Sequence, residues 1–240
     1  MSTLVCGAVA LIAGLIQGIT GFGGAVVMMV FLPSFFVLPT AAGIAGTVTI
    51  PMNLRMAIAY RKHIHLKDAL IPATLYLLAS IIAIRIAPDL PTRWVKFAFG
   101  CFLVLLALYF ILFQKKIKIR FTYAVSIPII VFSGICGGLF GIGGPLMAMY
   151  YMSKYDDRFD YLATTQTFFM VTSLPQMFVR FFSGILTATE ILPILVGIAA
   201  ILIGNTIAVY MNKILKPNTV RMATYLLVGI SGIINIVNTF

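Results

Sequence analysis

The sequence predicts an all-α polytopic membrane protein made of two inverted repeats. Each repeat is expected to be a broken or re-entrant helix pair, interrupted at glycines, followed by three transmembrane helices. Three observations carry this prediction: an extremely apolar composition, a glycine-rich stretch that occurs twice, and an uneven distribution of basic loops. The chain has 240 residues, of which 61% are hydrophobic and 10% are charged, and its mean hydropathy is +1.08. Such values lie outside the usual range of soluble domains.

Apolar runs recur from end to end, and each is long enough to cross a hydrocarbon core of roughly 30 Å. The longest polar stretches, RKHIHLKD (61–68) and QKKIKIR (114–120), are only connectors, so no soluble catalytic domain is expected. The N-terminal run lacks the positive region of a secretory signal, and we expect it to be retained. The three cysteines are odd in number and lie within apolar runs, which predicts buried thiols: Cys6, Cys101 and Cys136.

An internal repeat divides the chain in the middle. Shifted by 120 residues, GLIQGITGFGGA (14–25) aligns with GICGGLFGIGGP (134–145), and five glycines coincide. Weaker correspondences follow in the same order at offsets of 121 to 126: Pro51 with Pro175, Arg55 with Arg180, Pro72 with Pro193, and Pro91 with Pro217. The predicted repeats are therefore residues 1–120 and 121–240 of a single membrane domain.

The basic residues indicate how each repeat begins. If every glycine-rich stretch belonged to one simple crossing, each side of the membrane would hold 8 basic residues. If residues 4–38 and 122–153 instead enter and leave on the same side, the division becomes 12 against 4, as the positive-inside rule expects. The side with 12 holds Arg61, Lys62, Lys67, Lys115, Lys116, Lys118, Arg120, Lys154, Arg158, Lys213, Lys216 and Arg221. This arrangement places the basic loops in the cytoplasm and both termini outside, and it inverts the second half.

The glycine-rich stretches are predicted to be helix breaks that line a substrate site. Residues 4–38 are 35 positions, too many for one span but suited to two shorter helices. Irregular backbone at membrane depth is tolerated only inside protein or beside a cavity. Exposed N–H groups at paired breaks favour an anion. The glycines assigned to this cradle are Gly21, Gly23, Gly24, Gly141, Gly143 and Gly144. The alternative is that they merely allow helices to pack closely.

Polar side chains within apolar spans are the other candidates for substrate contact. Gln17 and Thr20 flank the first break, and Asn53 follows Pro51. Gln166 lies in a polar cluster, and Gln176 follows Pro175. Hydrogen bonding within or between helices would satisfy these groups equally well.

Arg55 and Arg180 are predicted to attract an anion from opposite faces of the site. The alternative is that both arginines reach the lipid headgroups and anchor their helices.

The paired stretches GLIQGITGFGGAVVMMVFLP and GICGGLFGIGGPLMAMYYM resemble the two signature segments of the TauE/SafE sulfite exporter family. The resemblance extends over nearly the whole chain, including residues 181–233. It implies export of sulfite or of a small organosulfonate such as sulfoacetate. The halves differ: Ala25 faces Pro145, while Tyr76 and Ala83 face Gly197 and Gly204, so close packing in the second half need not recur in the first.

The acidic residues all lie in or beside connectors, so no intramembrane carboxylate is expected to relay protons. The membrane potential alone can drive an anion out of the cell, by about 2.3 kcal/mol per charge per 100 mV. Coupling to a proton or to sodium remains open. His63 and His65 lack further ligands in their loop, and no metal site or cofactor is predicted.

The sequence therefore predicts a permease of the inner (plasma) membrane rather than an enzyme. Its expected partners are the lipid bilayer and a small anion, with no nucleic acid, and a homodimer is left open. The alternatives are an anion-selective channel or a permease for another organic anion.

Overall fold

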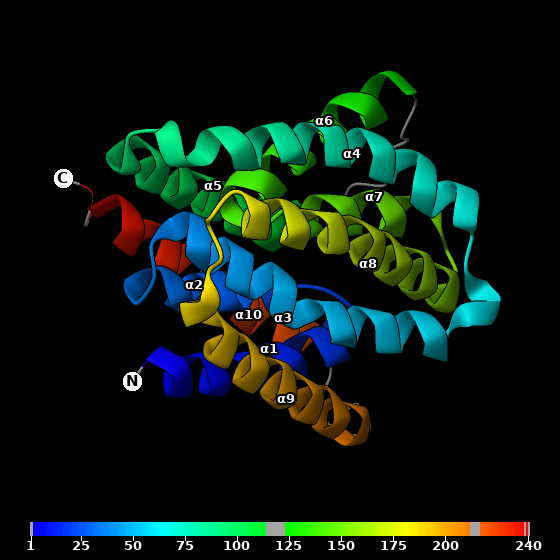
Figure 1. Cartoon of the computed structure of the whole chain (residues 1–240). Helices are drawn as coiled ribbons and strands as arrows, with labels where there is room; N and C mark the ends of the chain where they lie inside the picture. The colour runs from blue at the N-terminus through cyan, green and yellow to red at the C-terminus, as the bar shows by residue number, and fades with distance from the viewer. Residues whose placement is uncertain (1, 114–122, 212–216, 238, 240) are drawn as a thin grey trace.

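The computed structural model describes residues 2–113, 123–211, 217–237 and 239, and all regular structure in these ranges is helical (Figure 1). The α-helices are α1 (Ser2–Thr20), α2 (Gly24–Phe31), α3 (Leu38–Ala59), α4 (Leu66–Ile86), α5 (Thr92–Phe113), α6 (Tyr123–Phe140), α7 (Gly144–Lys154), α8 (Arg158–Phe182), α9 (Ala188–Met211) and α10 (Pro217–Val237). Three short 3-10 turns cover Leu32–Ser34, Arg61–His63 and Ala87–Asp89.

Both glycine-rich stretches break a helix, as predicted. The first break separates α1 from α2, and Gly21 and Gly23 adopt φ angles of 87° and 98° there. The second break separates α6 from α7, and Gly141 has a φ of 67°. These angles lie in the left-handed region that side chains with a Cβ disfavour, so glycine is required at these three positions.

The two broken hairpins enter the bundle from opposite ends. Figure 1 places both termini at one end, together with the connection from α2 to α3. The α3–α4 turn lies at the other end, and the α7–α8 connection joins it there through an ion pair of 2.6 Å between Lys154 and Asp68. The first hairpin therefore opens toward the termini, and the second opens toward the α3–α4 turn.

Glycines also allow two pairs of helices to approach closely, in both halves of the chain. In α1, a Cβ at Gly18 would lie 2.5 Å from the Ala208 Cβ of α9. In α6, a Cβ at Gly138 would lie 2.6 Å from the Ala83 Cβ of α4. Close helix packing therefore explains these two glycines. It also occurs at α4 of the first half, where the glycine comes from α6 of the second half.

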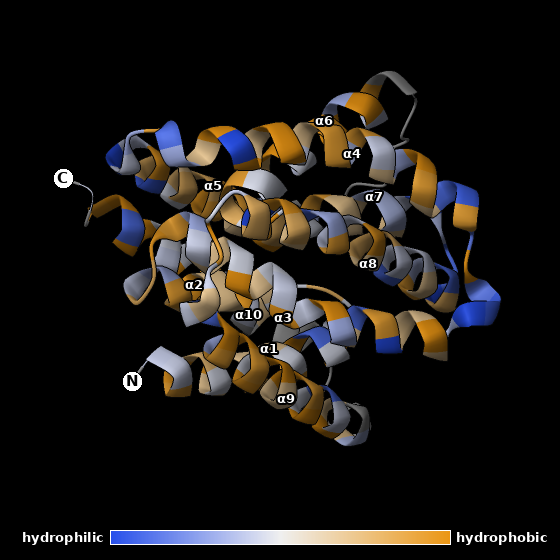
Figure 2. Ribbon diagram, viewed as in Figure 1, coloured by the Kyte–Doolittle hydropathy of each residue, from blue (hydrophilic) through white to orange (hydrophobic). Residues whose placement is uncertain are grey.

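The outside of the bundle is apolar, as a membrane protein requires (Figure 2). Within the described ranges, four helices are long and apolar enough to cross a membrane: Ser2–Thr20, Leu66–Asp89, Thr92–Leu112 and Ala188–Ala208. The 22-residue α3 and the 25-residue α8 are long enough but less apolar. Most of their polar residues are buried inside the bundle, among them Asn53 of α3 and Gln166 of α8, and these lower the hydropathy of both helices.

Polar surface is concentrated at the ends of the helices, including the 61–68 connector (Figure 2). Several basic residues used to predict the topology lie outside the described residues: Lys115, Lys116, Lys118, Arg120, Lys213 and Lys216. The Arg221 side chain lies outside them as well.

Candidate functional site

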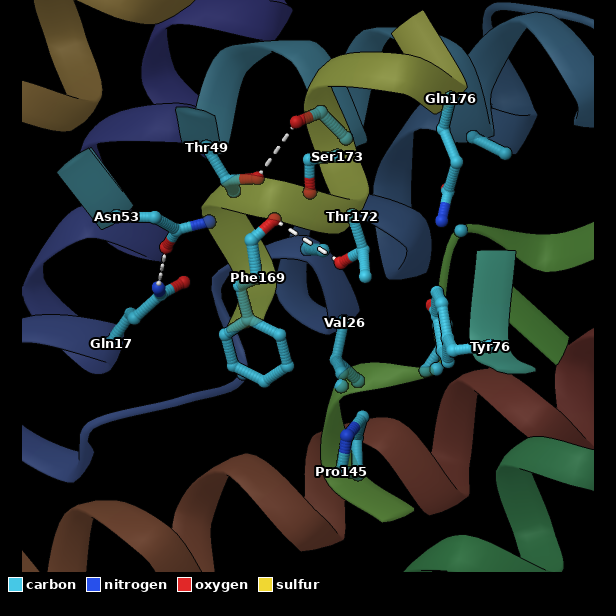
Figure 3. Close-up of a pocket in the computed structure, with 18 residues that line it drawn as sticks. Gln17, Val26, Thr49, Asn53, Tyr76, Pro145, Phe169, Thr172, Ser173 and Gln176 are labelled. Carbon is cyan, nitrogen blue, oxygen red and sulfur yellow. Dashed lines mark hydrogen bonds between the residues drawn. The ribbon is translucent and has the colours of Figure 1, made fainter. Parts of the chain in front are cut away.

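A cavity of about 60 Å³ lies between the two helix breaks (Figure 3). The first break contributes Gly23 to its wall, and the second contributes Gly141, Gly143 and Gly144. The remaining wall comes from α1, α2, α3, α4, α7 and α8. Segments far apart in the sequence therefore meet at one small chamber, and all of the described residues that line it are uncharged.

A chain of amide hydrogen bonds holds the first break. The Gly24 N–H donates to Gln17 Oε1 at 3.0 Å, and Gln17 Nε2 donates to Asn53 Oδ1 at 2.7 Å. Gln166 Nε2 donates to the Gly21 carbonyl at 2.6 Å. These three bonds involve Gly21 of the loop and four residues on four different helices, α1, α2, α3 and α8, so the amides fix the loop against α3 and α8. The N–H group of Gly24, assigned to the anion cradle from the sequence, here binds Gln17.

The second break is held differently, and the residue responsible is Tyr76 of α4. A Cβ at Gly143 or at Gly137 would collide with the Tyr76 hydroxyl, so the hydroxyl occupies space that both glycines leave free. Ser133 Oγ donates to the Gly143 carbonyl at 2.7 Å, which fixes the other side of the loop. Tyr76 and Gln176 of α8 both line the cavity (Figure 3).

Three hydroxyl residues and one aromatic ring complete the polar side of the cavity. Thr49 donates to the Gly46 carbonyl at 2.9 Å and Thr172 to the Phe168 carbonyl at 2.8 Å, both within their own helices. Ser173 and Phe169 also line the wall. Figure 3 shows these side chains facing the same space as Gln17 and Asn53. The cavity therefore presents amide and hydroxyl groups beside an apolar ring.

Of the candidates predicted from the sequence, Gln17, Asn53 and Gln176 line the cavity. Thr20 and Gln166 are buried but do not line it. Thr20 donates to the carbonyls of Ile16 at 2.8 Å and Phe22 at 2.7 Å, within its own segment. Tyr76 was not among the predicted residues, because a tyrosine in an apolar run gives no sequence signal that distinguishes it from a packing residue.

The two arginines occupy very different places. Arg180 is 2% exposed, and it donates to the carbonyls of Pro39 at 3.0 Å, Gly138 at 2.6 Å and Gly137 at 3.3 Å. It therefore caps the end of α6, where a cation is favoured. Arg55 is exposed and donates to Thr206 Oγ1 at 2.7 Å. Neither side chain lines the cavity, and only Arg55 has the exposure that an anchor in the headgroups needs.

A second polar cluster lies at the end of the bundle that carries the α3–α4 turn. His63 Nδ1 lies 2.8 Å from Asp160 Oδ1, and His65 Nε2 lies 3.5 Å from Asp160 Oδ2. The hydrogen bond with His63 lowers the pKa of Asp160. Ligand atoms of His63, Asp157 and Asp160 lie within 4.8 Å of one another. The acidic neighbours of the histidines come from α8 and its N-cap, which is why spacing within the 61–68 loop did not indicate them.

An apolar bundle with a polar cavity between two broken helices defines the class: a multi-pass membrane protein with an internal polar cavity. The family model for "Sulfite exporter TauE/SafE" matches residues 6–234, and the chain belongs to this family. The family is one of exporter-type membrane permeases for sulfite and related anions, which confirms the resemblance noted in the sequence. No curated protein and no solved structure matches the chain significantly.

Proposed function

We propose that the protein is a secondary transporter that exports small sulfur-containing anions, sulfite or an organosulfonate, and that the anion binds between the helix breaks. The observation that carries this proposal is the cavity itself. It joins both glycine breaks, and it offers hydroxyl and amide groups from Tyr76, Asn53 and Gln176. Neutral donors in a water-poor site can replace the hydration of an oxyanion. The proposed activity is transport without chemical conversion, since the family is one of transporters.

The transport mechanism we propose uses residues 1–120 and 121–240 as two inverted repeats. Two features support this arrangement. The hairpins open toward opposite ends of the bundle, and the glycine contacts are reciprocal: α1 meets α9 at Gly18, and α4 meets α6 at Gly138. Movement of one repeat against the other around a fixed site would give access to each side in turn.

We propose the inner (plasma) membrane as the location, with the α3–α4 turn in the cytoplasm and both termini outside. The basic residues of that turn support this orientation, because such loops are retained on the cytoplasmic side. The uncharged cavity wall favours efflux driven by the membrane potential over proton transfer through a cavity carboxylate.

The first test is to fill the cavity without disturbing the backbone. Gly46 lines the cavity in the middle of α3, and a Cβ there would meet no atom within 4 Å. Gly46→Leu should therefore fold normally and abolish flux of labelled sulfite in proteoliposomes held at a set membrane potential. Ala8→Leu, on an exposed position of α1, is the matched control and should transport normally.

Equal flux in the Gly46→Leu and wild-type proteins would place the pathway elsewhere. Anion flux per protein well above the turnover rates of transporters would favour the alternative function, an anion-selective channel. Absence of flux for every sulfur anion in the wild-type protein would refute the proposed substrate class.

A further inference from the structure

We infer that the cavity accepts singly charged anions and rejects doubly charged ones, because Arg180, a buried cation, supplies the one full charge that the described side chains place beside it. This inference rests on the proposed function, in which the cavity is the anion site. It narrows the substrate to monoanions such as hydrogensulfite and simple alkylsulfonates. Sulfite in its doubly charged form, sulfate and sulfoacetate would be poor substrates.

Within the described ranges, Arg180 has no acidic partner. Its guanidinium is 2% exposed and donates only to backbone carbonyls, those of Pro39, Gly137 and Gly138. The ion pairs found in the described part of the chain involve His63, His65 and Lys154, not Arg180. A buried charge without a counterion is costly, and it persists where another group compensates it.

The charge of Arg180 lies behind the cavity wall, as its neighbours show. Arg180 is four residues after Gln176 on α8, so the two side chains project from the same face one turn apart, about 6 Å along the helix. A Cβ at Gly43 would lie 3.2 Å from Arg180 Cδ, and the adjacent Ala42 lines the cavity. The carbonyls that Arg180 binds belong to the turns of α6 that lead into Gly141.

Among the residues that the structure describes, no other group near the cavity adds to the charge of Arg180 or cancels it. Every described residue in the wall is uncharged. Each break brings together the C-terminus of one helix and the N-terminus of the next, so their opposite partial charges largely cancel. The carboxylates Asp68 and Asp160 lie at the end of the bundle, where Lys154 and the two histidines pair with them. The described residues therefore give the cavity a net charge close to that of one guanidinium.

One cation balances one negative charge. The cost of removing an ion from water grows with the square of its charge, whereas its attraction to Arg180 grows only in proportion. A monoanion in the cavity neutralises Arg180 and completes a buried pair. A dianion pays about four times the desolvation cost and leaves one negative charge uncompensated in a poorly polarisable site.

The experiment compares anions of similar shape and different charge in proteoliposomes. Methanesulfonate and sulfate compete against labelled sulfite efflux at fixed potential, and labelled sulfite alone is measured at pH 6 and pH 8.5. We expect methanesulfonate to compete at least about tenfold better than sulfate. We also expect the KM for total sulfite to rise at high pH, as hydrogensulfite loses its proton. Equal competition by the two anions would overturn the inference while leaving the permease function intact. A KM for total sulfite that falls at high pH, where the doubly charged form predominates, would do the same.

Variants of Arg180 link the selectivity to this residue. Arg180→Lys keeps the charge and should keep the preference for monoanions. Arg180→Gln should raise the KM for methanesulfonate roughly tenfold with a smaller change in maximal flux, because the variant loses the electrostatic attraction between the guanidinium and the anion. Arg85→Gln, an exposed arginine of α4, is the control.

A merely structural role would lower maximal flux in both Arg180 variants without changing the KM, and this result would also overturn the inference. If Arg180→Gln does not fold, the inference is tested with Arg180→Lys. A preference for methanesulfonate over sulfate equal to that of wild type supports the inference, and loss of this preference overturns it.

Discussion

The Gln17 side-chain oxygen accepts a hydrogen bond of 3.0 Å from the Gly24 backbone N–H, which joins the helix before the first break to the first residue of the helix after it. The same amide donates to Asn53 of α3 at 2.7 Å. A single side chain thus connects three helices at the site.

Replacing Gln17 by Leu should destabilise the protein by about 2–4 kcal/mol, because it leaves the Gly24 N–H and the Asn53 oxygen buried without their partner. Thermal unfolding in detergent measures this loss. Thr74→Val, at an exposed hydroxyl that bonds within its own helix, should change the midpoint little. Unfolding midpoints that fall equally in both variants would contradict the role of Gln17.

Replacing Gly21 by Ala should be costly for a conformational reason. Gly21 has a φ of 87°, and an added Cβ would lie 2.5 Å from Leu162 Cδ2. Strain in the left-handed region costs about 1–2 kcal/mol before the contact is relieved. Gly46→Ala, in a regular helix with open space, should be neutral or slightly stabilising. If both variants unfold at the same temperature, the left-handed turn is not required.

Replacing Tyr76 by Phe should preserve the packing of the ring and remove one hydroxyl from the cavity. We expect a modest loss of stability, about 0.5–1.5 kcal/mol, and a clear rise in the KM for the transported anion. Tyr210→Phe, 71% exposed on α9, should leave the KM unchanged. A Tyr76→Phe protein with wild-type KM would remove the hydroxyl from the list of substrate contacts.

The histidine cluster predicts a dependence of stability on pH in acid. The hydrogen bond with His63 lowers the folded-state pKa of Asp160 below its ordinary value of about 4. The resulting stabilisation is present above the unfolded-state pKa and disappears as pH falls through the folded one. The difference in unfolding midpoint between wild type and Asp160→Asn should thus shrink from pH 6 toward pH 3. A difference that stays constant would show that the carboxylate charge is unimportant, and Asp89→Asn provides the comparison.

Arg55→Gln should behave as an ordinary surface substitution. The side chain is exposed and bonds only Thr206, so the expected change in stability is within about 0.5 kcal/mol and the KM should not move. A KM that rises as strongly as in Arg180→Gln would return Arg55 to the substrate pathway.

The sequence was sufficient for features that depend on backbone chemistry. Runs of glycine within an apolar stretch have few uses, and the breaks at Gly21–Gly23 and Gly141–Gly143 follow directly from them. It was insufficient where function depends on what the fold brings together. Arg55 and Arg180 match in the alignment, yet one lies on the surface and the other is buried against α6. Tyr76 gains its role only because Gly137 and Gly143 vacate the space that its hydroxyl fills.

That last contact limits how the two halves of the chain could ever be exchanged. At the shift of 120 residues, Gln17 corresponds to Gly137, whose missing side chain makes room for Tyr76. Two copies of residues 1–120 paired with each other would place a glutamine and a tyrosine in the same space. Two copies of residues 121–240 would have neither group to close the breaks. If the two halves arose by duplication, as the repeated glycines predict, a half-length ancestor that paired with itself would have needed a different polar centre.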